Sequence, residues 1–216
     1  MGIDWGVRTI ATTTNPDFDL AHPQHGRNGA AALAKYQRRM ARRAPARGQR
    51  GSRGYKKARR DAARAHKKVA RQRQDTARKW ARKVTRAHGR IAVEDFKPAF
   101  LSKSRMARKA ADATISVTRN ELVSYATRVG RQVVMVPPAY TTMTCSLCGS
   151  RAKTRLSLSE RTFRCEACGF IADRDRNAAS NMLVRAGFHP ADADAVRRPA
   201  LRKRKRTLAE SGIPRL

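Results

Sequence analysis

The first residues of the chain alternate between apolar side chains and polar or small ones. Residues 2–7 read GIDWGV, which has the two-residue period of a β-strand, and residues 8–14 continue the β-like pattern. Asn15 and Pro16 then predict a turn that leads to a short strand at 18–21. We therefore expect the chain to open with a β-hairpin.

A helical period follows. Apolar or small side chains recur at helical spacing between residues 55 and 88, including Ala58, Val69, Trp80 and Val84, with one break near 72–73. This spacing predicts a long helix over 55–88. A shorter helix is predicted over 29–44, and a proline and three glycines punctuate the link between the two. The pair is expected to form an antiparallel hairpin.

Strands and helices alternate in the remaining half. Residues 91–96 (IAVEDF) and 132–136 read as short strands, and an amphipathic helix is predicted over 112–129, with Gly130 as its stop. Residues 176–185 are predicted to be helical. Strands that alternate with helices indicate an α/β sheet.

The charge of the chain points to a polyanionic partner. The 216 residues contain 49 Lys and Arg against 16 Asp and Glu, a formal net charge of +33. Self-repulsion of that size disfavours an isolated domain, whereas binding to nucleic acid releases counterions from phosphates. A membrane surface is the competing polyanion, but we find no apolar run near the roughly 20 residues of a spanning helix and no signal-peptide pattern. We expect a cytosolic nucleic-acid-binding protein.

Basic residues concentrate in the predicted helical hairpin. Residues 35–90 hold 23 Lys or Arg and only 2 acids, so this segment is the expected contact surface for phosphates. The residues expected to contact nucleic acid are Arg53, Lys56, Lys57, Arg60, Lys67, Arg71, Arg151 and Arg155. Trp80 is expected in the core, with base stacking as its alternative. Residues 191–216 are basic, contain little that could pack, and are expected to form a disordered tail.

Four cysteines form two CxxC pairs. Cys145 and Cys148 are followed, after 16 intervening residues, by Cys165 and Cys168, and a glycine comes directly after each pair. Four thiolates in tetrahedral array suit zinc, and a closed set of four ligands predicts a structural ion rather than one that activates water. Disulfides or redox pairs are the alternative, which a reducing compartment disfavours.

Acids are scarce, so their positions are informative. Asp4 lies on the first predicted strand, on the face opposite Ile3 and Trp5, and we expect the neighbouring glycines to let a phosphate backbone approach. Glu94 lies on the second strand. Asp173 and Asp175 precede the last helix, where a carboxylate is ordinarily a helix cap.

Together these acids suggest one site. Carboxylates that converge repel one another unless cations bind, and two Mg²⁺ ions are the usual solution in sites that cleave phosphodiesters. The basic surroundings would hold the nucleic acid strand for in-line attack.

Four motifs resemble one protein family. GIDWGV, VEDF, the segment from YTTMTCSLCG to RCEACG, and ADRDRNAASNML resemble, in order and spacing, the C-terminal portion of the TnpB (OrfB) proteins of insertion sequences and, more distantly, type V CRISPR effectors. The resemblance covers nearly the whole chain. It implies an RNase H-like (RuvC-like) core with a helical hairpin and an inserted zinc ribbon, cleavage of DNA with Mg²⁺, and guidance by RNA. It also implies that Asp4, Glu94 and Asp175 form the catalytic triad, with Asp175 favoured over Asp173.

The expected division of the chain follows from this resemblance. Residues 1–138 would form the first part of the nuclease core, 139–170 the zinc ribbon, 171–190 the third core motif with its helix, and 191–216 the tail. Relatives carry a long N-terminal region ahead of the first nuclease motif, whereas here Met1 lies three residues before Asp4. A misassigned start, a decayed fragment and a stand-alone nuclease half all fit this difference.

Two hypotheses of different class therefore stand. The first is an Mg²⁺-dependent DNA endonuclease of a transposable element. The second is a catalytically inactive zinc-ribbon remnant that binds nucleic acid. A transposase that also joins strands is a third reading, and nothing in the sequence supports strand transfer specifically.

Overall fold

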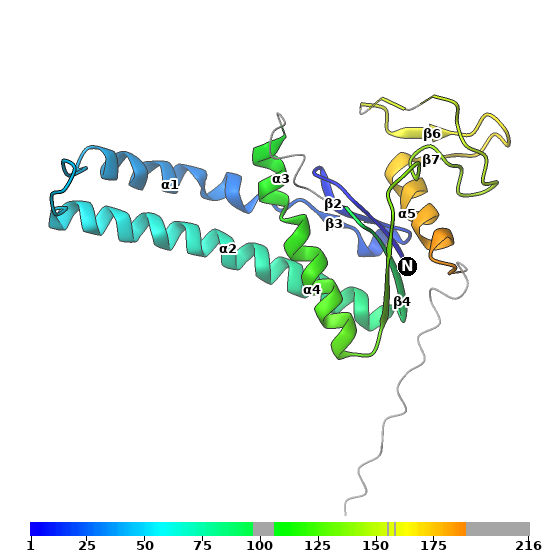
Figure 1. Cartoon of the computed structure of the whole chain (residues 1–216), viewed down its shortest axis with the longest axis horizontal. Coiled ribbons are helices and arrows are strands. Elements are labelled where there is room, and N and C mark those ends of the chain that lie inside the picture. The colour runs from blue at the N-terminus through cyan, green and yellow to red at the C-terminus, as the bar shows by residue number, and fades with distance from the viewer. Residues whose placement is uncertain (97–105, 155, 158, 189–216) are drawn as a thin grey trace, which may run out of the picture.

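The centre of the molecule is a five-stranded mixed sheet. The computed structural model describes residues 1–96, 106–154, 156–157 and 159–188. The strand order is β3-β2-β1-β4-β5 (Figure 1). The strands are β1 (Gly2–Trp5), β2 (Thr9–Thr13), β3 (Leu20–Ala21), β4 (Arg90–Glu94) and β5 (Gln132–Val136). β1 pairs antiparallel with β2 and parallel with β4, and β4 pairs parallel with β5, so the predicted α/β class is confirmed. The hairpin predicted around Asn15 and Pro16 is formed by β2 and β3, whereas the turn at 6–8 that divides the first strand pattern into β1 and β2 was not predicted.

The basic helical hairpin is also confirmed. α1 (His25–Ala41) and α2 (Arg53–Ala87) run antiparallel and project away from the sheet (Figure 1). α1 begins at His25 rather than at residue 29, because the carboxylate of Asp112 accepts hydrogen bonds from the N–H groups of Gly26 (2.7 Å) and Arg27 (3.2 Å). These amides would otherwise lack partners at the helix start. Arg73 of α2 donates to the same carboxylate at 2.7 Å, so Asp112 joins both arms of the hairpin.

The helix predicted over 112–129 is two helices. α3 (Ala107–Ala113) and α4 (Ile115–Arg128) are separated by Thr114, whose φ of +49° is left-handed. The break lies next to Asp112, which is anchored at the start of α1 and so fixes the direction of α3. A local apolar pattern contains no sign of that anchor. Gly130, with φ +65°, follows the end of α4 as predicted.

The sheet buries both of its faces. On one face, Ile3 and Trp5 of β1 pack with Trp80 and Val84 of α2 and with Leu122 of α4. Trp5 and Trp80 meet edge to face at 5.9 Å and are each 5% exposed. Trp80 is therefore a core residue and cannot stack on a base. The other face is covered by α5 (Arg174–Arg185), whose Met182 and Leu183 pack on β4 and β5.

Shorter elements complete the structure. A 3-10 helix, η1 (Pro16–Phe18), forms the predicted turn before β3. β6 (Thr162–Arg164) and β7 (Ile171–Asp173) form a separate two-stranded sheet that leads directly into α5. The expected tail at 191–216 lies outside the described residues. Within the described ranges, none of the helices has the length and apolarity needed to traverse a lipid bilayer.

Candidate active site

Strands β1 and β4 bring Asp4 and Glu94 together. Gly2 pairs with Ala92 and Ile3 with Val93 in the parallel register, so the next positions, Asp4 and Glu94, are neighbours on one face of the sheet. The backbone N–H of Trp5 donates to Oε2 of Glu94 at 3.3 Å, and the indole Nε1 of Trp5 donates to the carbonyl of Glu94 at 3.1 Å. Asp4 and Glu94 are only 9% and 8% exposed, although both are acidic.

Helix α5 adds the third carboxylate to that face. A Cβ atom at Gly2 would overlap the carbonyl oxygen of Ala179, so α5 lies against the backbone of β1. Asp175 is one helical turn before Ala179 and is thereby placed at the end of β1 where Asp4 lies. Gly2 was expected to leave space for a phosphate backbone. That expectation is wrong, because α5 occupies the space beside Gly2.

Gly6 has a local role as well. A Cβ there would lie 2.7 Å from the carbonyl oxygen of Thr9, within the turn that joins β1 to β2. The phosphate-approach expectation is therefore wrong for both glycines, because protein backbone already fills the space.

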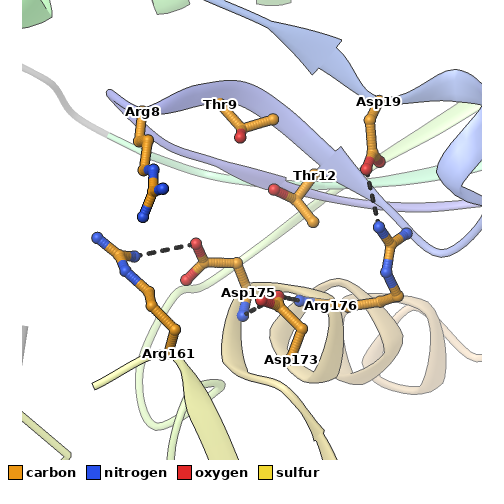
Figure 2. Close-up of a pocket in the computed structure, with 8 residues that line it drawn as sticks. All are labelled: Arg8, Thr9, Thr12, Asp19, Arg161, Asp173, Asp175 and Arg176. Carbon is orange, nitrogen blue, oxygen red and sulfur yellow. Dashed lines mark hydrogen bonds and ion pairs between the residues drawn. The ribbon is translucent and has the colours of Figure 1, made fainter. Parts of the chain in front are cut away.

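Asp173 and Asp175 have different roles. Asp173 is the N-cap of α5, and its Oδ1 accepts hydrogen bonds from the N–H groups of Asp175 and Arg176, both at 3.0 Å. This is the ordinary cap that an acid at a helix start predicts. The Asp175 carboxylate instead accepts hydrogen bonds from Arg161 (Figure 2) and from Arg174.

The pKa values of Asp4 and Glu94 are both raised, mainly by burial, and the charge of Asp175 contributes to each rise. Burial raises the pKa of Asp4 well above its usual range, and the charges of Glu94 and Asp175 raise it further, while Arg174 partly offsets them. Burial is also the main reason that the pKa of Glu94 rises to about 7; the hydrogen bond from Trp5 opposes this rise and Asp175 adds to it. No described residue donates a hydrogen bond to the Asp4 carboxylate. Asp4 is thus a buried carboxylate with no hydrogen-bond donor beside it, next to Glu94 and Asp175. Together the three carboxylates offer oxygen ligands suited to a hard cation.

Two arginines partly neutralise Asp175. Arg161 Nη1 lies 3.2 Å from Oδ2 and Arg174 Nη2 lies 3.2 Å from Oδ1 of Asp175. Arg174 also donates to the carbonyl of Ser157 at 2.9 Å. Sequence reasoning identified neither Arg161 nor Arg174 as a partner of Asp175.

The four cysteines gather at one point. Their sulfur atoms all lie within 4.8 Å of one another, with Cys145 and Cys168 at 3.8 Å and Cys148 and Cys165 at 3.6 Å. Sulfurs about 2.3 Å from a central tetrahedral ion would lie about 3.8 Å apart, so the spacing fits a metal. None of the four is in a disulfide. The backbone N–H of Cys168 is the main reason that the pKa of the Cys165 thiol falls to about 7. For Cys168 the backbone N–H of Phe170 acts in the same direction, but the neighbouring thiols and burial outweigh it and raise the pKa to about 12, so the case for a metal rests on the sulfur spacing.

The turns after each pair take the predicted form. Gly149 and Gly169 have φ of +75° and +74°, and their N–H groups donate to the carbonyls of Cys145 (2.9 Å) and Cys165 (3.0 Å). Left-handed backbone of this kind favours glycine. We refer to residues 139–170 as the ribbon.

The ribbon is fastened to α5 by two asparagines. Asn177 accepts a hydrogen bond from the N–H of Ser146 at 2.9 Å and donates to the carbonyl of Thr144 at 2.8 Å. Asn181 donates to the carbonyls of Thr144 at 2.6 Å and Thr141 at 2.8 Å. Both asparagines are buried, so the helix that carries Asp175 is held by the segment around the first cysteine pair. Sequence reasoning missed this link, which joins residues more than 30 positions apart.

The basic residues predicted to bind nucleic acid do not join the carboxylates. The six that lie on α2 are all exposed, and none forms an ion pair with another described residue: Arg53, Lys56, Lys57, Arg60, Lys67 and Arg71. They lie along the hairpin, away from the sheet (Figure 1). We call these six residues the basic face of α2. Arg151 lies over the ring of Tyr140, 3.2 Å from its centroid, and Arg155 is outside the described residues.

Two family models match the chain. Residues 1–105 match the OrfB_IS605 model, described as "Probable transposase", and residues 116–182 match the model "Cas12f1-like, TNB domain". A Streptomyces pristinaespiralis protein named "Putative RNA-guided DNA endonuclease" is 32% identical over 226 residues, which cover 100% of this chain and 54% of that protein. The chain belongs to the TnpB (OrfB) family. Escherichia coli K12 InsQ, another TnpB relative with the same name, is 32% identical over 201 residues, or 85% of this chain and 48% of InsQ.

Solved structures share the fold. A Cas12f1 chain in complex with guide RNA and target DNA aligns with a TM-score of 0.57 at 18% identity, and a Cas12f chain of a ternary complex with 0.59 at 20% identity. Each alignment covers 84% of this chain, and 48% and 37% of those chains. The TnpB-family chain described here spans about half the length of the curated relatives that it matches over most of its own length.

Proposed function

We propose that this TnpB-family protein is a metal-dependent DNA endonuclease whose RuvC-like, RNase H-type core uses Asp4, Glu94 and Asp175. The convergence of these three carboxylates on one face of the sheet carries the proposal. They come from β1, β4 and α5, in a chain with a formal net charge of +33. A structural role would not require Asp4 and Glu94 to be buried side by side, at the expense of their ionisation, next to a third carboxylate.

The donor set fits Mg²⁺. All three side chains offer oxygen, and the pKa values of Asp4 and Glu94 are raised first by burial and then by neighbouring negative charge, both of which a bound divalent cation would offset. When bound, Mg²⁺ would supply a nucleophilic hydroxide at neutral pH and stabilise the charge that develops on the leaving oxygen. Asp4, Glu94 and Asp175 would hold the metal, and the N–H of Trp5 orients the Glu94 carboxylate toward the shared face.

Zinc is the metal we propose for the ribbon. Four sulfurs at tetrahedral spacing leave no open coordination position, so the ion would be structural. Its effect on activity would pass through Asn177 and Asn181, which fix α5 and hence Asp175 to the ribbon. In this scheme residues 1–138 and 171–190 form the nuclease core and 139–170 the zinc ribbon.

Nucleic acids are the proposed partners. The uncompensated basic face of α2 fits a phosphate backbone, and two of the family's relatives carry names as RNA-guided DNA endonucleases. DNA would be the substrate, and a guide RNA would be a second ligand.

Cleavage of labelled single-stranded and double-stranded DNA tests the proposal. Purified protein should cut with Mg²⁺ and not with EDTA, and Asp4→Asn, Glu94→Gln and Asp175→Asn should each abolish cutting while salt-sensitive binding remains. Asp173→Asn is the matched control, because asparagine keeps the helix cap and removes a nearby charge. It should retain cleavage.

Two other outcomes would replace the proposal. If the protein binds DNA without cutting it, both with and without RNA transcribed from the end of the transposable element, it is a nucleic-acid-binding protein without catalysis. Ligated products in the same reactions would identify strand transfer.

A further inference from the structure

A cavity of about 340 Å³ adjoins the carboxylate site. It lies between the β1–β2 hairpin, the start of α5 and the ribbon, and Asp175 forms part of its wall (Figure 2). That volume has room for roughly ten waters, or for a phosphate group with its sugar. The wall is polar and contains three arginines, Arg8, Arg161 and Arg176.

Two of these arginines already have partners. Arg176 donates to the carboxylate of Asp19 at 2.8 Å, and Arg161 donates to that of Asp175 at 3.2 Å. The third acid in the wall, Asp173, accepts two N–H groups at the start of α5. These contacts account for each acidic group of the wall.

Arg8 is the exception. Its side chain lies in the turn after β1 and extends toward Arg161 and Asp175 (Figure 2). No residue in the described part of the chain accepts a hydrogen bond from Arg8 or pairs with its charge. The cavity therefore has an uncompensated guanidinium at one side, and a metal on Asp175 would release Arg161 as a second one.

Thr12 links this cavity to the carboxylates. It is the cross-strand partner of Asp4 in the antiparallel register of β1 and β2. Directly opposed residues project to the same face of a sheet, so the Thr12 side chain lies beside Asp4 while it also lines the cavity. An anion held at Arg8 would thus lie next to the reacting centre.

We propose that this cavity is a subsite for the backbone phosphate that adjoins the cleaved one, with Arg8 binding its oxygens and Thr12 donating a hydrogen bond. The assignment rests on the proposed nuclease function. A guanidinium binds two phosphate oxygens at once, which fixes the strand's direction as well as its position. Arg8 would register the strand so that the next phosphate faces Asp4, Glu94 and Asp175.

Cleavage of modified DNA tests this role. A series of single-stranded substrates would carry one neutral methylphosphonate each, placed in turn at every position around the cut. At one position next to the cut, wild-type kcat/KM should fall by roughly 10- to 100-fold, as for loss of a charged hydrogen bond. Arg8→Ala should fall by a similar factor on unmodified DNA and should lose no more at that position. Arg8→Lys should recover part of the rate. An equal response of Arg8→Ala and wild type to every methylphosphonate would overturn the subsite.

Equilibrium binding separates the subsite from the nuclease proposal. With Ca²⁺ in place of Mg²⁺, Arg8→Ala should reduce the slope of log Kobs against log salt concentration by about 0.7, the contribution of one single-strand phosphate. Arg128→Ala, an exposed arginine in the last turn of α4 before the start of β5, is the matched control and should leave cleavage unchanged. A reduced slope without cleavage by wild type would contradict the nuclease and support the phosphate site. An unchanged slope would contradict the phosphate site even in an active enzyme.

Discussion

The guanidinium of Arg161, in the ribbon, lies 3.2 Å from the carboxylate of Asp175, at the start of α5. Arg161 belongs to the ribbon, which contains the four cysteines, and Asp175 belongs to the carboxylate site. The ribbon thus supplies a cation to the same oxygens that we propose for Mg²⁺. Arginine and metal would compete for Asp175.

Arg161→Ala should tighten Mg²⁺ binding to the protein without nucleic acid. The pair is partly exposed, with side chains 41% and 28% accessible, so the gain should be small, at most about five-fold in affinity. Calorimetric titration with MgCl₂ measures it. Arg164→Ala, an exposed arginine on β6, is the control and should leave the affinity unchanged. Equal affinity of Arg161→Ala and wild type would show that the two cations do not compete.

The stability of the metal-free protein should depend on Glu94 and pH. The pKa of Glu94 is about 7 in the folded protein against an ordinary 4.5, so the folded state binds this proton more tightly than the unfolded chain. The stability that protonated Glu94 contributes is complete below pH 4.5 and is lost as the pH rises to 7, a loss of up to about 3 kcal/mol. Glu94→Gln should remove this loss and be the more stable protein at pH 8 in EDTA.

Urea unfolding at several pH values measures this effect. Glu166→Gln, at an exposed position of the ribbon, should retain the wild-type pH dependence. Mg²⁺ should raise the stability of wild type at pH 8 by more than that of Glu94→Gln. The contribution of Glu94 is the free energy of unfolding of wild type minus that of Glu94→Gln at each pH in EDTA. If this difference rises from pH 5 to pH 8, the raised pKa of Glu94 is contradicted.

Gly2→Ala should displace α5. The added methyl group would meet the backbone of Ala179 rather than a flexible side chain, so the helix and Asp175 must move. We expect a loss of about 1–3 kcal/mol in the free energy of unfolding and a much weaker stabilisation by Mg²⁺. Gly54→Ala, in the first turn of α2, is the control, because its methyl group would meet only the flexible side chain of Arg43. An unaltered Mg²⁺ response in Gly2→Ala would show that α5 does not fix the site.

Much of the arrangement could be predicted from residue patterns. The two-residue period located the strand-forming stretch that contains β1 and β2 but not the turn between them, the helical period located the α1–α2 hairpin, and the CxxC spacing predicted the cysteine cluster. Scarcity of acids marked Asp4, Glu94, Asp173 and Asp175, and the family resemblance favoured Asp175 over Asp173. The structure places Asp4, Glu94 and Asp175 together; their catalytic role stays a prediction.

The contacts that fix these groups could not be predicted in the same way. The start of α1 depends on Asp112, the docking of α5 on Gly2, and the surroundings of Asp175 on Arg161. Asp112 is far in the sequence from the start of α1, and Gly2 is far from Ala179 of α5. Local propensity contains no information about such distant pairs. The bond between Arg161 and Asp175 spans fewer residues, but it depends on the fold of the ribbon.

Asp112→Ala should loosen the helical hairpin. Burial would raise the pKa of Asp112, but hydrogen bonds from Arg73, Gly26 and Arg27 outweigh it and lower the pKa. The stability from Asp112 is therefore present above its ordinary pKa of 3.8 and is lost as the pH falls below it. Loss of this buried acceptor should cost about 3 kcal/mol at neutral pH.

Denaturant unfolding, with hydrogen exchange in α1, measures that change. Asp75→Ala is the matched control: Asp75 pairs with Lys79 on the surface of α2, where both side chains are exposed, and its loss should cost less than about 0.5 kcal/mol. Equal destabilisation by the two substitutions would show that Asp112 is no more than a surface charge.

The contact between Gly2 and Ala179 joins the two ends of the described chain. A ribosome makes the basic face of α2 long before it makes α5, so a growing chain can hold nucleic acid while Asp175 does not yet exist. Under the proposed function, cutting would begin only after α5 has been synthesised and docked against β1.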